Sequence, residues 1–439
     1  MLRSIFVIIA LVAGSSFAVT SPLYAAAFYL WIAYFRPESW AWSGVFATWN
    51  LSYIAGVFLI IRTLMSKVQM RLTWRTALML LFLGLSLLST FNGLHPTHSM
   101  EFWQAFAKTI VIGYLLTVII TTEAELRLIF LVVTLSVGFE AAKQGWGQLI
   151  LHPGAKNPNS IPFLGDNNLV AVGMAMLIPL IGALAATATG WWKRGLQFLN
   201  VGVIYRGLST YSRGGFLSLG AVAATWFWRS DRKPQAVIVG VLLAVLMLPV
   251  MPSQFWERMS TITASAEERD DSQAGRLHFW QVAVAMANDR PMTGVGHSGY
   301  ELAYDQYDTS EGKYGTGRAV HSAWFGMLAE IGYPGLIVFV MIVAFSLLTC
   351  ARVRRMAQRA EISESLGRYG AALESSLLAF IVGGSFVSFQ YSEMLWHFFA
   401  LTIALERVAV TNAEWVRAQQ GAVARTPAPA QPADDFVWA

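Results

Sequence analysis

The sequence predicts an all-α polytopic membrane protein. Its 439 residues are 55% hydrophobic and only 13% charged, whereas soluble domains carry roughly 25% charge. Apolar runs of about 17 to 25 residues recur along most of the chain, and each is long enough to cross a hydrocarbon core of roughly 30 Å as a helix. We therefore expect one integrated bundle of about 12 transmembrane helices.

The first apolar block, residues 4–35, is interrupted at Ser21 and Pro22, because proline removes a backbone donor and breaks a helix. The block is either one broken span or a tight hairpin. Its start resembles a signal peptide, but apolar sequence continues through Tyr34, so we interpret it as an uncut anchor. Further spans are predicted near 43–63, 74–93, 103–121, 126–149, 168–189, 195–210, 214–228, 235–251, 322–350, 371–390 and 394–410.

Basic clusters between the apolar runs predict the orientation of the bundle. The clusters are Lys67 with Arg71 and Arg75, Lys193 with Arg194, Arg229 with Arg232 and Lys233, and Arg352 with Arg354 and Arg355. Because positive loops stay in the cytoplasm, parity places residues 152–167 and 252–320 outside. The formal charge of +5 therefore reflects topology, and we expect no nucleic-acid partner.

Four regions follow along the chain. They are N-terminal transmembrane helices (1–251), a periplasmic loop domain (252–320), C-terminal transmembrane helices (321–411) and a disordered cytoplasmic tail rich in Pro and Ala (412–439). Within the loop, Leu277, Trp280, Val284 and Ala287 recur at helical spacing, which predicts a helix against the bundle or the membrane surface.

The first candidate for chemistry is His321, where a polar loop ends and a long apolar helix begins. A helix start is electropositive and disfavours imidazolium, so the ring stays available as a general base. The alternative is a histidine that caps the helix or sits at the interface.

Arginines on the predicted outer side run against the positive-inside bias, so topology does not explain them. Arg213 precedes Gly214 and Gly215, and Arg276 follows Gly275. A guanidinium binds phosphate oxygens at two points, and glycines let the backbone approach an anion. These two arginines could therefore hold a diphosphate. Arg36 and Arg206 are further candidates, with snorkelling or local salt bridges as the alternative.

Weaker candidates surround these residues. Lys143 lies three residues after Glu140 on one helix face, and mutual neutralisation is favoured over substrate contact. Asn168 could contact a sugar, whereas Asp166 before it could simply cap a span. Four aromatic residues could stack on sugars but also suit the ordinary interfacial belt. These are Trp146, Tyr211, Trp280 and Tyr300.

Several site classes are disfavoured. Residues 294–299 match Gly-x-Gly-x-x-Gly, but no strand-turn-helix unit surrounds them, so a compact turn is the better interpretation. We find no Walker lysine loop, no His-Glu-x-x-His and no convincing carboxylate pair. Cys350 is the only cysteine, so an internal disulfide and a cysteine-based metal site cannot form. We expect neither a metal nor a cofactor.

With these residues assembled, the chain resembles the O-antigen ligase and O-antigen polymerase superfamily of bacterial envelope glycosyltransferases. The resemblance covers the layout of spans with one large loop before the second-last pair. Its most specific part is His321-Ser322 followed after nine residues by Gly332-x-x-Gly335. Ser212-Arg213-Gly214-Gly215, and Arg276 with Trp280 four residues on, also resemble family blocks.

The resemblance implies a GT-C-like glycosyltransferase of the inner membrane that acts at the periplasmic face without metal or nucleotide. It implies an undecaprenyl-diphosphate-linked glycan donor, with His321 as the base, Arg213 and Arg276 on the diphosphate, and Arg36 as a further family arginine. The run Tyr34 to Trp40 resembles the exosortase-associated ligase branch, which leaves lipid A-core, a protein or another glycan as the acceptor. A polymerase of the same superfamily and a lipid-linked glycan transporter are the alternatives.

Overall fold

The structure is a computed structural model that describes every residue except 1, 42–48, 231, 248–251, 261–270 and 426–439. Five of its helices are long and apolar enough to cross a membrane, which supports a multi-pass membrane protein, but the count of 12 is not confirmed. They are α5 (Trp74–Asn92), α6 (Pro96–Ile119), α8 (Asn167–Thr187), α15 (Ala323–Gln358) and α17 (Glu393–Arg425). Shorter apolar helices are α1 (Leu2–Ala18), α2 (Pro22–Phe35), α4 (Leu51–Leu64) and α11 (Lys233–Met247).

The N-terminal block is a hairpin and not a single broken span. A Cβ on Gly14 of α1 would lie 2.4 Å from the ring of Phe28 on α2, and the rings of Phe17 and Tyr24 are 6.2 Å apart. Both pairs are symmetric about the Ser21 break, so the two helices are antiparallel. Arg3 accordingly returns to the end of the bundle that holds Trp40, with its guanidinium 5.4 Å from the indole centroid.

The centre of the bundle is α8, whose apolar stretch is 78% buried. It packs against α7 (Glu123–Leu151), α9 (Gly190–Leu208), α10 (Arg213–Arg229) and α16 (Glu364–Gly384). The start of α10 approaches α8 closely, since a Cβ on Gly215 would lie 2.2 Å from the Cβ of Ala171. Small residues thus allow the close helix contacts that packing in a membrane favours. On the other side, α15 and α17 pack together with α5 and α6.

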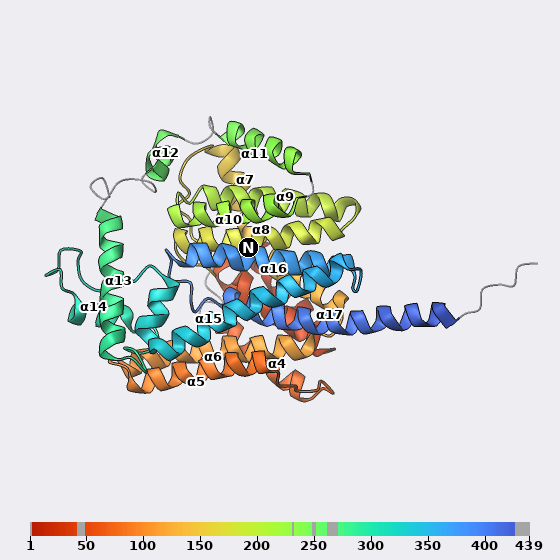
Figure 1. Cartoon of the computed structure of the whole chain (residues 1–439), viewed down its shortest axis with the longest axis horizontal. Coiled ribbons are helices and arrows are strands. Elements are labelled where there is room, and N and C mark those ends of the chain that lie inside the picture. The colour runs from red at the N-terminus through yellow and green to blue at the C-terminus, as the bar shows by residue number, and fades with distance from the viewer. Residues whose placement is uncertain (1, 42–48, 231, 248–251, 261–270, 426–439) are drawn as a thin grey trace, which may run out of the picture.

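A small second core lies at one end of the bundle, where α13 (Asp271–Asp289) runs across the ends of the other helices beside α14 (Tyr300–Tyr307) (Figure 1). The short helices α3 (Pro37–Trp40) and α12 (Ser253–Ser260) complete the described elements. The core contains Phe279, Val282, Met286 and Tyr304.

The predicted loop helix exists, but its predicted buried face is rotated. Leu277 is 43% exposed, whereas Phe279, Val282 and Ala283 are buried. The reason is that α13 packs against both α15 and α14, and the spacing of apolar residues did not indicate which side of the helix these two neighbours cover.

The long helix α15 is broken at Gly332, which has φ 75° and ψ −173°. A side chain there would be strained, and its Cβ would lie 2.5 Å from the carbonyl oxygen of Pro291. Tyr333 donates its N–H to that same carbonyl at 2.9 Å instead of continuing the helix. Pro334, which has no N–H, cannot restore the pattern.

The break leaves two helix carbonyls without a donor from α15, and the turn at residues 294–299 supplies N–H groups to them. Val295 donates its N–H to the carbonyl of Ala329 at 2.9 Å, and Gly296 donates to that of Glu330 at 3.2 Å. Gly294 and Gly296 both have positive φ. The Gly-x-Gly-x-x-Gly match is therefore a compact turn that caps a helix break.

Some helix ends differ from the predictions because helices continue past their apolar stretches. α6 begins at Pro96 and α17 continues to Arg425, whereas we expected a span from 103 and a disordered tail from 412. Residues 413–425 are rich in Ala, Gln and Arg, which favour helix without any apolar periodicity. The rest of the predicted tail, 426–439, lies outside the described residues.

Candidate active site

His321 lies directly before the start of α15. Ser322 is the N-cap, and its hydroxyl accepts the N–H of Phe325 at 3.5 Å. The backbone of His321 has φ 50°, in the left-handed region that residues other than glycine rarely adopt. Such strained positions persist where the surroundings hold them, and they concentrate at functional sites. The imidazole is half-buried and lies at the N-terminal end of α15.

The charges around His321 favour its neutral form. Burial is the largest cause that lowers the pKa of its imidazole, and Arg276 lowers it further. Asp166 opposes this shift, and Arg318 adds to it. At pH 7 the ring is therefore neutral and can accept a proton. Burial and the charge of Arg276 are thus the main causes of the shift.

Arg276 is held on α13 beside the loop that carries His321. One turn later, Trp280 donates its indole N–H to the carbonyl of Val320 at 3.2 Å. The same ring stacks on Phe325, with centroids 5.1 Å apart and planes 11° from parallel. Trp280 therefore acts as a clamp between α13 and the start of α15, and no sugar-stacking role is needed to explain its position.

Arg318, which the sequence analysis missed, belongs to the same group of charges. It lies three residues before His321 and is exposed, with its guanidinium 5.5 Å from the ring centroid of Phe279. The available signal was the dipeptide Gly317-Arg318, because Gly275-Arg276 has the same form.

Arg213 is the first residue of α10, and it is 8% exposed. The N-cap Ser212 accepts the N–H of Gly215 at 3.2 Å. A Cβ on Gly214 would lie 3.1 Å from Phe386, whose ring centroid is 6.5 Å from that of Trp280. The start of α10 and the clamp of α13 thus meet at Phe386, which brings the helix that carries Arg213 to the His321 region.

Arg206 and Tyr211 fasten the loop 152–167 to α9. Arg206 is fully buried and donates from Nε to Oε1 of Gln144 at 2.8 Å and from Nη2 to the carbonyl of Asn159. The hydroxyl of Tyr211 donates to the carbonyl of Gly154. These bonds to protein groups give both side chains a structural role.

The other weak candidates are also held by local contacts. Asp166 caps α8 by accepting the N–H groups of Asn168 at 2.6 Å and Leu169 at 3.0 Å, so it reaches the His321 region from a helix start. Lys143 pairs with Glu140 at 2.5 Å, three residues away. The geometry supports neutralisation for Lys143, and it shows no contact between Asn168 and the histidine.

Arg36 belongs to a second polar cluster. It has φ 53° between α2 and α3 and lies 3.9 Å from Glu38. Its charge acts on Glu393 at the start of α17, which pairs with Lys108 at 3.2 Å. The electrostatic influence of Arg36 therefore falls on Glu393, whereas the charges that act on His321 are those of Arg276, Asp166 and Arg318.

A cavity of about 820 Å³ lies between α8, α9, α10 and α16. Its walls are mainly apolar and include Ile178, Leu208, Val222 and Trp226. Leu208 is the last residue of α9, five residues before Arg213. One end of the apolar cavity therefore approaches the segment that leads to the buried arginine.

Comparison with known proteins adds a family to this geometry. Residues 198–340 match the family model described as O-antigen ligase, and residues 2–161 match a family of unknown function. No curated protein matches the chain. Arg213, Arg276 and His321 all lie within the first match, whereas Arg36 lies within the second. In the described part of the chain, no three His, Cys, Asp or Glu side chains gather as metal ligands would.

Proposed function

We propose that this chain, which belongs to the O-antigen ligase superfamily, transfers a glycan from undecaprenyl diphosphate to lipid A-core at the periplasmic face of the bacterial inner membrane. One observation carries the proposal. A neutral, half-buried imidazole at a helix start lies within the electrostatic reach of Arg276, and both residues fall in the segment that matches the ligase family.

The chemistry needs a base for the acceptor and stabilisation of the leaving group. His321 takes the proton of the acceptor hydroxyl as its oxygen attacks the anomeric carbon. The bond from that carbon to the phosphate oxygen breaks, and its electron pair leaves with undecaprenyl diphosphate. Arg213 and Arg276 bind the diphosphate as charge develops on it. A single displacement inverts the configuration at the anomeric carbon.

The apolar cavity supports a lipid-linked donor. A polyprenyl chain needs an apolar surface within the bilayer, and the cavity between α8, α9, α10 and α16 offers one that extends from Arg229, at the end of α10, to Leu219 and Leu208 on the side nearer Arg213. In this arrangement the chain lies along Leu208 and Val222, and the diphosphate lies beyond them at Arg213. Ala223 lines the cavity and its neighbour Ala224 does not, so Ala223→Trp should weaken donor binding while Ala224→Trp should not.

The packing of the bundle favours an enzyme over a lipid-linked glycan transporter. A transporter needs a polar path from one end to the other, but aromatic rings fill the space between the Glu393 cluster and Arg75. Trp396, one turn after Glu393, lies 4.8 Å from the ring of Phe82 and 5.5 Å from that of Phe399. All three are fully buried.

The decisive experiment reconstitutes the purified full-length protein with a lipid-linked glycan donor and lipid A-core, without nucleotide and with a chelator. We expect glycosylated lipid A-core with inverted anomeric configuration. A product in which donor glycans join each other would instead identify a polymerase, and transfer to an added protein acceptor alone would identify a protein O-glycan ligase. A strict metal requirement would overturn the proposed chemistry.

A further inference from the structure

A cavity of about 680 Å³ lies at the end of the bundle opposite His321. α15 starts beside His321, and Ser346 and Thr349 in its later part contact Arg75 at the edge of this cavity. The walls come from the segment before α5, the end of α6 and the middle of α17. Its charged lining consists of Arg71, Arg75, Arg407, Glu406 and Glu414. The volume falls within the range of about 300 to 1,000 Å³ that is usual for small-molecule sites.

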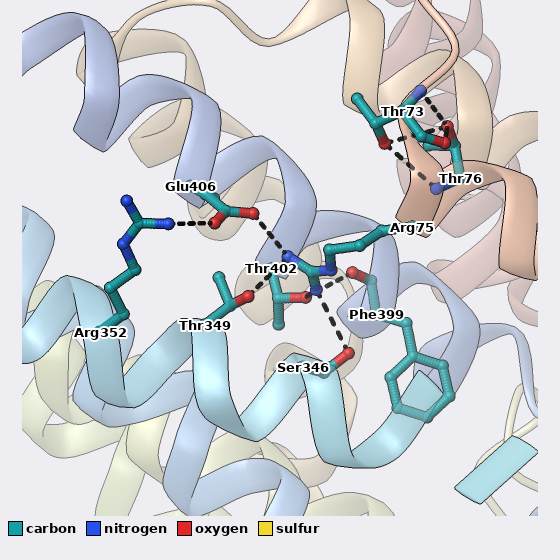
Figure 2. Close-up of polar contacts among 9 residues, drawn as sticks. All are labelled: Thr73, Arg75, Thr76, Ser346, Thr349, Arg352, Phe399, Thr402 and Glu406. Carbon is teal, nitrogen blue, oxygen red and sulfur yellow. Dashed lines mark hydrogen bonds and ion pairs between the residues drawn. The ribbon is translucent and has the colours of Figure 1, made fainter. Parts of the chain in front are cut away.

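The inner wall is rigid and already paired. Arg75, which is 5% exposed, donates to Glu406 at 3.1 Å and to Thr349 at 2.9 Å (Figure 2). Glu406 also accepts from Arg352 at 3.2 Å, so it lies between two guanidinium groups (Figure 2). The charge of Glu406 is therefore already neutralised by two arginines. Arg75 forms the buried wall of the cavity and is not available to bind a ligand.

The other two arginines are held by neutral oxygens. Arg407 donates from Nη1 to the carbonyls of Thr117 and Val118 in the last turn of α6, at 3.2 and 3.0 Å, where helix carbonyls lack partners. Arg71 donates from Nε and Nη2 to the amide oxygen of Gln69, at 3.1 and 2.7 Å. Among the described residues, neither forms an ion pair with a carboxylate.

Two like charges thus face one cavity, and neither forms an ion pair with Glu406 or Glu414 in its lining, although the charge of Glu125 also acts on Arg407. The charge of Arg71 acts unfavourably on that of Arg407, and both face one cavity. An anion between them would relieve the repulsion and replace weak neutral acceptors with charged ones, which form stronger hydrogen bonds. The remaining nitrogens of Arg407 also support an anion site. Its Nη1 donates to α6, and its Nε and Nη2 have no acceptor in the described protein.

The remaining walls are apolar. They include Trp74, Val118, Ile403 and Val410. Trp74 is 58% exposed and packs edge-on against Phe345 with centroids 4.6 Å apart, the behaviour of an aromatic side chain at a membrane interface. A free phosphate would use only the arginines, whereas a phospholipid would also cover these apolar walls.

We propose that this cavity binds the phosphodiester headgroup of an anionic phospholipid. Arg71 and Arg407 bind the phosphate, and the glycerol and first acyl carbons lie against Trp74 and Val410. The site is separate from the donor site around Arg213 and does not depend on the proposed transferase activity.

The test measures lipid binding to the delipidated full-length protein in detergent by native mass spectrometry, with phosphatidylglycerol, phosphatidylethanolamine and inorganic phosphate as probes. We expect saturable binding of phosphatidylglycerol and much weaker binding of the other two. Arg71→Gln and Arg407→Gln should each weaken phosphatidylglycerol about fivefold, the usual effect of one basic residue at a membrane surface. Glu414→Gln removes a negative charge that repels the phosphate from the rim of the cavity, and it should strengthen phosphatidylglycerol binding.

Two further variants keep the result specific. Arg355 is exposed at the same end but does not line the cavity, so Arg355→Gln makes the same change in net charge and should leave binding unchanged. Val410→Trp fills the cavity without changing charge and should weaken binding. Equal loss in Arg355→Gln would reduce the effect to general charge attraction and overturn the proposal. Inorganic phosphate that binds as tightly as the lipid would overturn the lipid assignment.

Discussion

The two ends of the bundle use arginine in different ways. At the Arg75 end, carboxylates are shared between guanidinium groups: Glu406 lies between Arg75 and Arg352, and Glu374 lies between Arg229 and Arg354 at 2.8 and 3.2 Å. These networks join α5, α10, α15, α16 and α17. Removing one member would leave a partly buried charge without its partner, which is costly.

At the His321 end, arginines act on a histidine instead. The charges that shift its pKa are those of Arg276, Arg318 and Asp166, and the carboxylate of Asp166 already caps α8. Positive charge therefore predominates around His321. The comparison separates two environments: at the Arg75 end guanidinium groups share carboxylates that join helices, whereas at the His321 end they shift the pKa of an imidazole. Five predictions test this contrast.

The largest effect is expected for His321→Ala. Loss of a general base should slow transfer by about 10² to 10⁴-fold, while donor affinity stays close to that of the parent protein. The measurement is product formation and donor binding in the reconstituted system. His152 is exposed at the end of α7, so His152→Ala serves as the control. Equal product from His321→Ala would remove the assigned base.

At the opposite end, Arg75→Met should act on stability. It leaves Glu406 with one partner and removes a donor from Ser346 and Thr349, so we expect a loss of about 3 kcal/mol in the free energy of unfolding. Thermal unfolding in detergent measures it, and transfer per folded molecule should persist. Exposed Arg355→Met is the control. Loss of activity without loss of stability would break the contrast between the ends.

Arg213→Gln and Arg276→Gln should each weaken donor binding about tenfold to a hundredfold, because a hydrogen bond to a charged group contributes roughly 1.5 to 3 kcal/mol. Arg354→Gln, which alters the paired end, should leave donor affinity intact. If both outer variants unfold early and bind the donor normally, these arginines are structural.

Gly332→Ala tests the scaffold of the His321 end. An alanine at φ 75° is strained, and its Cβ would meet the carbonyl of Pro291 at 2.5 Å, so we expect destabilisation by about 1 to 3 kcal/mol. Gly147 on α7 has open space around it, and Gly147→Ala should be neutral or stabilising. Similar unfolding temperatures for the two variants would contradict the assigned break.

The smallest effect concerns pH. In the proposed mechanism His321 acts as a neutral base, and its pKa lies below the ordinary value of about 6.5, so kcat/KM should fall only as pH drops below that value. Arg276→Gln removes a charge that lowers the pKa of His321, so the fall in kcat/KM should begin at a higher pH. Asp166→Asn removes a charge that raises it, keeps a capping side chain, and should move the start of this fall to a lower pH. Shifts in the same direction would exclude the assigned electrostatics.

The sequence predicts the helices well because apolar runs are local signals, but it leaves their mutual arrangement open. Ser21 and Pro22 mark a break, and only the contact of Gly14 with Phe28 decides between a broken span and a hairpin. The helical residues beyond 412 have no apolar periodicity, so their composition was mistaken for disorder.

The site shows the same limit. His321 is a candidate because a polar loop meets an apolar helix there, and neighbouring glycines, after Arg213 and before Arg276, mark the two arginines as candidates. Their approach depends on Trp280, Val320 and Phe386, which are far apart in the chain and carry no special pattern. Arg36 is chemically similar to the other arginines, yet its charge acts on Glu393, a proximity that local sequence could not indicate.

The broken helix at Gly332 has a consequence for recognising relatives by their glycines. That glycine is required by its close approach to the carbonyl of Pro291 and by the turn that caps the break, and the proposed mechanism gives it no role. By the proposed mechanism, a chain that kept this spacing but carried another side chain in place of His321 would adopt the same architecture without the transferase activity. The glycine pattern therefore indicates the shared fold, whereas the imidazole is what indicates the proposed activity.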